Sequence, residues 1–151
     1  ARRAGEGSAE VLAQLHKVPG CENLTWNDVQ IASTIFAVKP GDGSAREQAA
    51  SCQRVLGAGA NIVTEYATKR YRSNLINWGM LPLQLVGATP FGLGDYVFIP
   101  NVREALKGDL QDIKAYVLGD TAKEFSLYMA PLTADERKIL ADGCLINFYK
   151  H

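Results

Sequence analysis

Apolar residues along this chain gather into short continuous runs that alternate with amphipathic stretches, a pattern typical of a fold that mixes strands and helices. The run IASTIFAV (31–38) has the length and β-branched content of a strand, and we expect it to be buried on both faces. Further strands are predicted at 61–66, within MLPLQLVG (80–87), at 95–99, in 114–120 and in 124–129. Pro82 should keep its strand at a sheet edge or a bend, because proline lacks the N–H that a central strand donates.

Helices are predicted where apolar residues recur with helical spacing. One helix is expected over 8–17, a second over 45–56 ending in a left-handed turn at Gly57, and a third from about 71 to Gly79. The last should begin at the capping box Thr133-Ala134-Asp135-Glu136. Its apolar positions would be Ile139, Leu140, Cys144, Ile146 and Phe148. This alternation of strands and helices favours an α/β sandwich or layered sheet over a helical bundle.

Composition narrows the class of protein. A length of 151 residues suits one domain, and 47% apolar against 21% charged residues permits a real core. The 16 basic and 16 acidic residues balance to zero net charge. Because nucleic-acid binding usually needs a basic surplus or stripe, we expect no nucleic-acid partner, RNA included.

The three cysteines, Cys21, Cys52 and Cys144, are widely spaced and form no CxxC pair. We therefore expect reduced thiols, and neither a disulfide framework nor a metal site built by this chain alone. No apolar run approaches the roughly 18 residues that a membrane span requires. The first residues also lack the apolar segment of a secretory signal, so a cytoplasmic location is expected.

The segment GDGSAREQAA (41–50) offers two interpretations. Ser44 and Glu47 have the spacing of a capping box, which would make the segment an ordinary helix start. Alternatively, Gly41 and Gly43 would permit unusual backbone angles and close approach of a ligand, while Arg46 would add positive charge at the positive end of a helix. Those features together favour a carboxylate or phosphate site. The segment matches neither a phosphate-binding Walker loop nor a nucleophile elbow.

Three segments in the same order resemble the C-terminal domain of the aconitase and isopropylmalate dehydratase superfamily. GDGSAREQAASCQRVLGAGANIV (41–63) resembles the family's G-[DE]-G-S-S-R-E-H-A-A segment with its following strand. NLINWGMLPLQL (74–85) resembles the family's N-L-x-x-x-G-M/L-L-P-L segment, with wording closest to bacterial aconitase-like hydratases of uncertain substrate. LTADERKILADGCLINFY (132–149) resembles its closing helix.

This resemblance implies a swivelling, three-layer β/β/α domain over residues 1–151 that lacks the family's first strand and loop. Ser44 would be the catalytic base, removing a proton α to a carboxylate, and Arg46 would bind a substrate carboxylate. Gly43 and Ala45 would complete the substrate-binding turn. Ala45 stands where the family usually has a second serine, and Gln48 stands where it usually has a histidine.

The resemblance also implies a hydro-lyase that interconverts hydroxy-polycarboxylic acids by dehydration and rehydration. The family's [4Fe-4S] cluster would be held by other domains, in the same chain or in a large subunit, with no ligand from this one. We therefore expect this chain to be inactive alone. The alternative is a non-catalytic anion-binding or interaction module that kept the anion site and lost the chemistry, an interpretation that Ala45, Gln48 and the missing first unit favour.

Overall fold

The chain forms two sheets and a layer of helices. The structure is a computed structural model that describes residues 8–25, 29, 31–119, 121–143 and 149. Its elements in chain order are α1 (Ser8–Leu15), β1 (Ser33–Ala37), α2 (Arg46–Val55), β2 (Ala58–Val63), α3 (Lys69–Asn77), β3 (Leu81–Gln84), β4 (Tyr96–Phe98), α4 (Val102–Lys107), β5 (Ile113–Leu118), β6 (Lys123–Leu127) and α5 (Ala134–Asp142).

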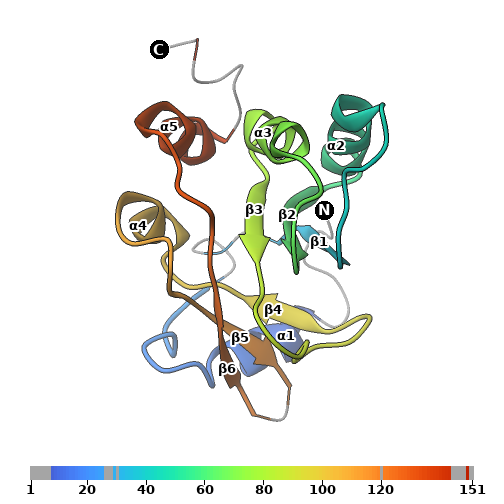
Figure 1. Cartoon of the computed structure of the whole chain (residues 1–151). Helices are drawn as coiled ribbons and strands as arrows, with labels where there is room; N and C mark the ends of the chain where they lie inside the picture. The colour runs from blue at the N-terminus through green and yellow to red at the C-terminus, as the bar shows by residue number, and fades with distance from the viewer. Residues whose placement is uncertain (1–7, 26–28, 30, 120, 144–148, 150–151) are drawn as a thin grey trace.

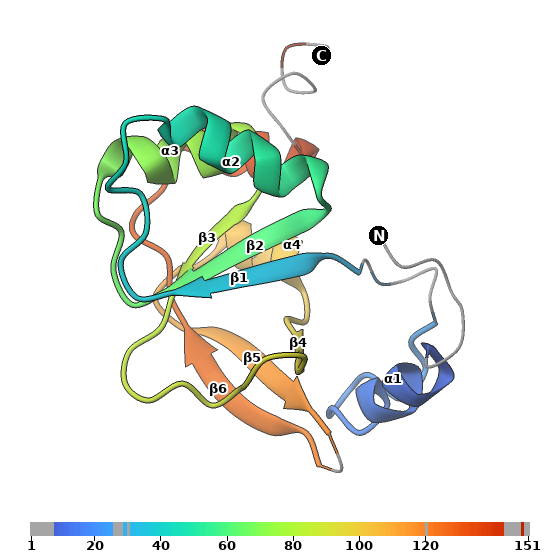
Figure 2. The ribbon, with the colours of Figure 1, turned by 90° about the vertical axis from the view of Figure 1, so that its right-hand side faces the viewer.

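The first sheet is parallel and has the order β1-β2-β3. Helices α2 and α3 are the crossovers of two successive βαβ units, and both lie on the same face of this sheet (Figures 1 and 2). Gly57 adopts φ +91° after the last turn of α2, which lets the chain reverse directly into β2, as the sequence predicts. The carboxyl ends of the three strands and the N-termini of both helices therefore lie at one edge of the sheet.

The second sheet is antiparallel, with the order β4-β5-β6, and lies on the face of the parallel sheet away from α2 and α3 (Figure 2). Helix α5 lies beside α3 in the helical layer (Figure 1). An isolated antiparallel bridge between Gln84 and Tyr128 joins the two sheets. The result is the β/β/α layering expected for this chain.

Three groups of buried side chains hold these layers together. The largest lies between the two sheets and under α3 and α5, and includes Ile62, Leu83, Ala115 and Leu127. A second fills the space between the parallel sheet and helices α2 and α3. A third packs α1 and the turn after it on the antiparallel sheet, around Leu118. Within the described residues, no helix is both long and apolar enough to cross a bilayer.

One expectation about the elements is wrong, and one helix lies where none is predicted. Strand β1 is an edge strand whose residues are half-buried or exposed, with 41% of Phe36 accessible, so 31–38 is not covered on both faces. The strand of this sheet that is buried along almost its whole length is β2, because it alone has a neighbour on each side. Helix α4 has no counterpart among the predicted helices, since its six residues are too few to show a helical period.

The closing helix begins as predicted and ends earlier than its apolar pattern suggests. Thr133 Oγ1 accepts a hydrogen bond from the Glu136 N–H (3.2 Å), and the Glu136 carboxylate accepts one from the Thr133 N–H (2.8 Å). Helix α5 stops at Asp142, and Gly143 follows in a left-handed conformation with φ +90°. Cys144, Ile146 and Phe148 lie outside the described residues.

Thr133→Ala is expected to lower the free energy of unfolding by about 1 kcal/mol, because it removes the side-chain oxygen that caps α5. Urea denaturation of the chain measures this difference. Thr89→Ala, in the exposed segment after β3, is the matched control and should change the free energy of unfolding by less than about 0.5 kcal/mol. Equal losses for the two variants would contradict a specific capping contribution.

Candidate active site

The segment between β1 and α2 lies at the carboxyl edge of the parallel sheet, on the left of Figure 2. Open α/β sheets bind ligands at this edge because the loops and helix N-termini that meet there are free of the strand ladder. The turn between β2 and α3 lies at the same edge. Residues 41–46 therefore occupy the place in the fold where a binding site is expected.

Helix α2 begins one residue later than the capping-box interpretation requires. Its N-cap is Ala45, and no side chain caps the helix. Glu47 is then the second residue of the helix instead of the third, so it is out of register for a reciprocal bond with Ser44. The capping-box interpretation of Ser44 and Glu47 is wrong, and the first N–H groups of α2 have no side-chain acceptor among the described residues.

The three small residues of this turn are open to solvent. Gly43, Ser44 and Ala45 are all exposed. A Cβ atom placed on Gly43 would meet nothing within 4 Å, so there is room beside the backbone at this position. Gly43 does not adopt a positive φ, whereas Gly41 does, with φ +94°. The unusual backbone angle expected in this segment therefore falls on the first glycine alone.

Arg46 is anchored by one side of its guanidinium group. Its Nε donates a hydrogen bond to the Gly41 carbonyl oxygen (3.1 Å), and the residue is half-buried. Its terminal nitrogens have no hydrogen-bond partner within the described part of the chain. A guanidinium held in this way keeps its outer donors for a carboxylate or phosphate, which it binds in a two-pronged geometry.

Tyr66 is the ionisable residue at this edge with the most perturbed environment. Its hydroxyl is buried without a hydrogen-bond partner among the described residues, and its ring lies 6.2 Å from that of Tyr71. Burial, with a smaller contribution from Tyr71, raises the pKa of the Tyr66 phenol well above its ordinary value. Tyr66 therefore stays neutral at ordinary pH.

Comparison with known proteins shows which family this chain is similar to. The model of the aconitase C-terminal domain matches residues 18–87. Aconitate hydratase A of Mycobacterium avium is 34% identical over 116 residues, a match that covers 72% of this chain and 12% of that protein. The solved structure of 3-isopropylmalate dehydratase from Methanocaldococcus jannaschii aligns with a TM-score of 0.55 and 30% identity, covering 82% of this chain and 66% of that one. The chain belongs to the aconitase family.

The match to the aconitase C-terminal domain contains both the Gly41–Arg46 turn and the whole 74–85 segment. It ends before the closing helix that also carries the resemblance. The mixed parallel and antiparallel architecture is similar to that of the dehydratase structure. This aconitase-family chain spans 12% of the aconitate hydratase and 66% of the dehydratase, so the activity of either whole protein is not established for it.

The described residues of this aconitase-family domain do not fit an iron–sulfur cluster. They contain no group of three or more His, Cys, Asp or Glu side chains placed to hold a metal ion. Cys21 is buried under α1, whereas Cys52 is exposed on α2, and Cys144 is outside the described residues.

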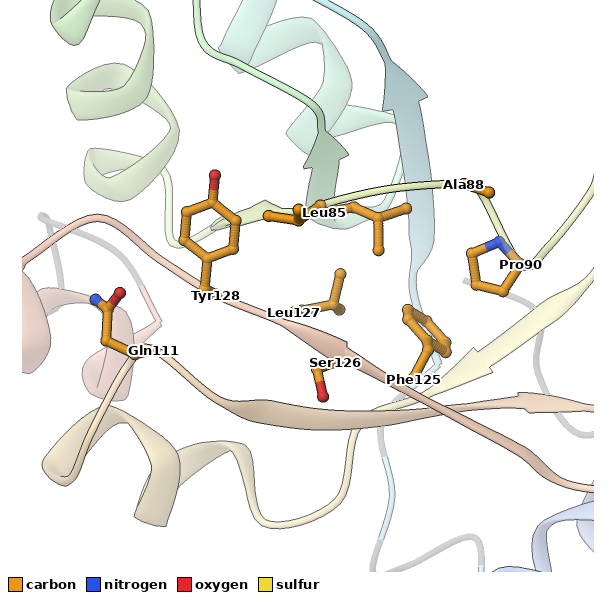
Figure 3. Close-up of a pocket in the computed structure, with 9 residues that line it drawn as sticks. Leu85, Ala88, Pro90, Gln111, Phe125, Ser126, Leu127 and Tyr128 are labelled. Carbon is orange, nitrogen blue, oxygen red and sulfur yellow. The ribbon is translucent and has the colours of Figure 1, made fainter.

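A cavity of about 350 Å³ lies between the segment that follows β3 and strand β6. Figure 3 shows Leu85, Pro90, Phe125 and Leu127 around it, with the side chains of Gln111, Ser126 and Tyr128 at its border. None of the residues that line it comes from the Gly41–Arg46 turn. The sequence shows no motif for this cavity, because its walls come from three segments that only the fold brings together.

The fold adds four residues to the neighbourhood of the turn that the sequence does not single out. Gln53, Asn61, Thr68 and Tyr71 connect α2, β2 and α3 beneath Gly41. The one local signal is Thr68, which precedes α3 and caps it by accepting a hydrogen bond from the Tyr71 N–H (3.2 Å). A polar residue buried in a central strand, such as Asn61, gives no sequence signal of its partner.

Proposed function

We propose that this chain is the substrate-binding and base-supplying domain of an aconitase-like hydro-lyase. Its substrate would be a hydroxy-polycarboxylic acid, and its working form would be this chain together with the cluster-bearing domains of the family. Those domains would be joined to it in one polypeptide or supplied by a separate large subunit. We use "complete enzyme" for that assembly.

The observation that carries this proposal is the exposed Ser44 at the uncapped N-terminus of α2, two residues before the anchored Arg46. Backbone N–H groups without side-chain acceptors and the positive end of the helix dipole favour an anion at this point. A serine without a hydrogen-bond partner in the described part of the chain is also free to contact a substrate. The family membership connects this arrangement to hydro-lyase chemistry.

In the proposed reaction, Arg46 and the first N–H groups of α2 bind a substrate carboxylate. This places the adjacent C–H bond against Ser44 Oγ. The serine alkoxide takes the proton from this carbon, the electron pair of the C–H bond forms the carbon–carbon double bond, and hydroxide leaves from the neighbouring carbon toward groups outside this chain. A serine hydroxyl is a weak base in water, so the reaction needs the N–H donors and positive charge that stabilise the alkoxide.

A non-catalytic anion-binding module is the second candidate. It is favoured by Ala45 and Gln48, which replace polar positions of the family pattern. In that case a complete enzyme would bind hydroxy-polycarboxylates without converting them. Binding without turnover in an assay of the alkene intermediate by its ultraviolet absorbance would support this candidate over the hydro-lyase.

Arg46→Lys is expected to raise the KM of the complete enzyme for its substrate by about tenfold or more. A lysine ammonium loses both the hydrogen bond from Nε to Gly41 and the two-pronged contact with a carboxylate. Steady-state kinetics of the alkene assay measure this change. Arg103→Lys, an exposed arginine on α4, is the matched control and should leave KM unchanged. A KM within twofold of the wild type for Arg46→Lys would remove Arg46 from the binding site (roughly 0.4 kcal/mol).

A further inference from the structure

Gly41 is pressed against a side chain of another element. A Cβ atom placed on Gly41 would lie 2.6 Å from Cβ, Cγ and Cδ1 of Tyr71, the third residue of α3. Ordinary contacts of a Cβ atom begin at 3.4 Å. The backbone of the turn therefore rests directly on the Tyr71 ring, at a distance that only glycine permits.

The carbonyl oxygen of Gly41 fixes the same residue from the other side. It accepts hydrogen bonds from Arg46 Nε (3.1 Å) and from Thr68 Oγ1 (3.4 Å). Thr68 Oγ1 also accepts the hydrogen bond from the Tyr71 N–H that caps α3. Gly41 is thus held between the first residue of α2 and the first turn of α3.

Tyr71 is in turn fixed by its hydroxyl, deep below the turn. The hydroxyl oxygen accepts hydrogen bonds from Gln53 Nε2 of α2 (2.9 Å) and Asn61 Nδ2 of β2 (3.1 Å). Tyr71 is 2% exposed and Asn61 is fully buried. These two bonds connect the ring under Gly41 to the central strand of the sheet.

This buried polar group is not arranged for stability alone. The side-chain carbonyl oxygens of Gln53 and Asn61 are buried and have no hydrogen-bond partner within the described residues. A partly satisfied buried network is less favourable than apolar packing of the same volume. Buried polar atoms that lack a hydrogen-bond partner are found mainly at sites where a fixed geometry matters for function.

We propose that Tyr71 and Gly41 are positioning residues for the proposed base Ser44. The Tyr71 ring, held by Asn61 and Gln53, fixes how closely the Gly41 backbone approaches α3. The Gly41 carbonyl in turn orients the Arg46 side chain through the hydrogen bond from Nε. Ser44 lies between these two fixed points, so its hydroxyl is placed by contacts that it does not itself make. This inference rests on the proposed function for its catalytic consequence, whereas the contacts stand on their own.

Gly41→Ala in the complete enzyme tests the inference. The new methyl group would have to move by about 0.8 Å, the difference between 2.6 and 3.4 Å, and a displacement of this size costs on the order of 100-fold in rate. We expect kcat to fall about 100-fold when it is measured well below the melting temperature. A purely structural role would lower the melting temperature and leave the kcat of folded enzyme unchanged, and that result would overturn the inference.

Variants of two other glycines distinguish an effect at the Gly41 position from a general effect of steric or backbone strain. Gly59→Ala brings a Cβ atom equally close, 2.6 Å from Ala32 Cβ, near the start of β2 and away from the turn. Gly20→Ala tests positive φ alone, since Gly20 has φ +81° and nothing within 4 Å of its Cβ position. Both should keep kcat within about twofold of the wild type. An equal loss of kcat in Gly59→Ala would overturn the inference.

Thr68 provides a test by conservative replacement. Thr68→Val removes the hydroxyl that bonds the Gly41 carbonyl and should lower kcat about tenfold, whereas Thr68→Ser keeps that hydroxyl and should restore kcat to within about threefold of the wild type. Wild-type kcat in Thr68→Val, or a serine variant as slow as the valine variant, would contradict a role for this hydrogen bond.

A readout that needs no activity keeps the inference separate from the proposed function. Trypsin binds its arginine in an extended, accessible segment, so cleavage after Arg46 requires the first turn of α2 to open and this half-buried side chain to leave the Gly41 carbonyl. In the chain itself, Tyr71→Phe should raise the rate of this cleavage by about fivefold or more, and Gly59→Ala should not. An unchanged rate in Tyr71→Phe would overturn the inference. Faster cleavage in a complete enzyme without hydratase activity would support it and reject the proposed function.

Discussion

Ser44→Ala is expected to lower kcat of the complete enzyme by about 10²–10⁴-fold, the range that a positioned general base contributes. The substitution removes the oxygen that would take the proton and leaves Arg46 and the helix N-terminus in place, so KM should change little. Thermal stability should also be unchanged, because Ser44 is exposed and makes no hydrogen bond with the described residues. Steady-state kinetics and a thermal melt of the same preparation measure the three quantities.

Ser51→Ala is the matched control for this variant. Ser51 lies on the same helix, and its hydroxyl donates only to the Gln48 carbonyl (3.1 Å), so its loss should leave kcat within about twofold. A fall of less than about tenfold (1.4 kcal/mol) in Ser44→Ala would remove Ser44 as the base. A large fall in both serine variants would instead indicate that α2 as a whole had been disturbed.

Leu75→Ala is expected to lower the free energy of unfolding by about 2–5 kcal/mol. Leu75 of α3 is fully buried against Ala50, Tyr71 and Met80, in the layer between the helices and the parallel sheet. Truncation removes apolar surface and leaves a cavity that the neighbouring helices fill only partly. Urea denaturation of the chain gives the difference from the wild type.

Leu56→Ala is the control for Leu75→Ala, because Leu56 is 80% exposed at the end of α2 and should cost less than about 0.5 kcal/mol. If the two leucine variants were equally stable, the described packing of α3 on the sheet would be wrong. A Leu75→Ala variant with normal stability would lead to the same conclusion.

The elements that the sequence predicts well are those with local signals. The Thr133–Glu136 capping box and the left-handed Gly57 each satisfy backbone groups within a few residues, so the pattern and the structure agree. The β/β/α class follows from the resemblance, and the structure confirms it. Pro82 lies in β3, an edge strand of the parallel sheet, as expected. Proline has no N–H to donate to a second neighbouring strand, so the residue type itself predicts this position.

Features that depend on distant partners are not visible in the sequence. The apolar run 31–38 resembles a buried strand, yet whether β1 has a neighbour on one side or two is decided by the sheet order. The N-cap of α2 is Ala45 instead of Ser44, in a turn where Gly41 contacts Arg46, Thr68 and Tyr71. Contacts with a neighbouring helix leave no local pattern in the sequence. The roles proposed for Ser44 and Arg46 stay predictions until the variants above are measured.

The bridge between Gln84 and Tyr128 has a consequence for how this domain tolerates sequence change. Two main-chain hydrogen bonds form it, from the Gln84 N–H to the Tyr128 carbonyl (2.7 Å) and from the Tyr128 N–H to the Gln84 carbonyl (3.0 Å). Every residue except proline supplies both groups. The main-chain bridge between the two sheets therefore places almost no constraint on which residue types occupy positions 84 and 128. Alanine at either position would remove the side-chain hydrogen bond from Gln84 Nε2 to the Tyr128 hydroxyl (3.3 Å) but would leave both main-chain bonds, so relatives can change these side chains and keep the same bridge.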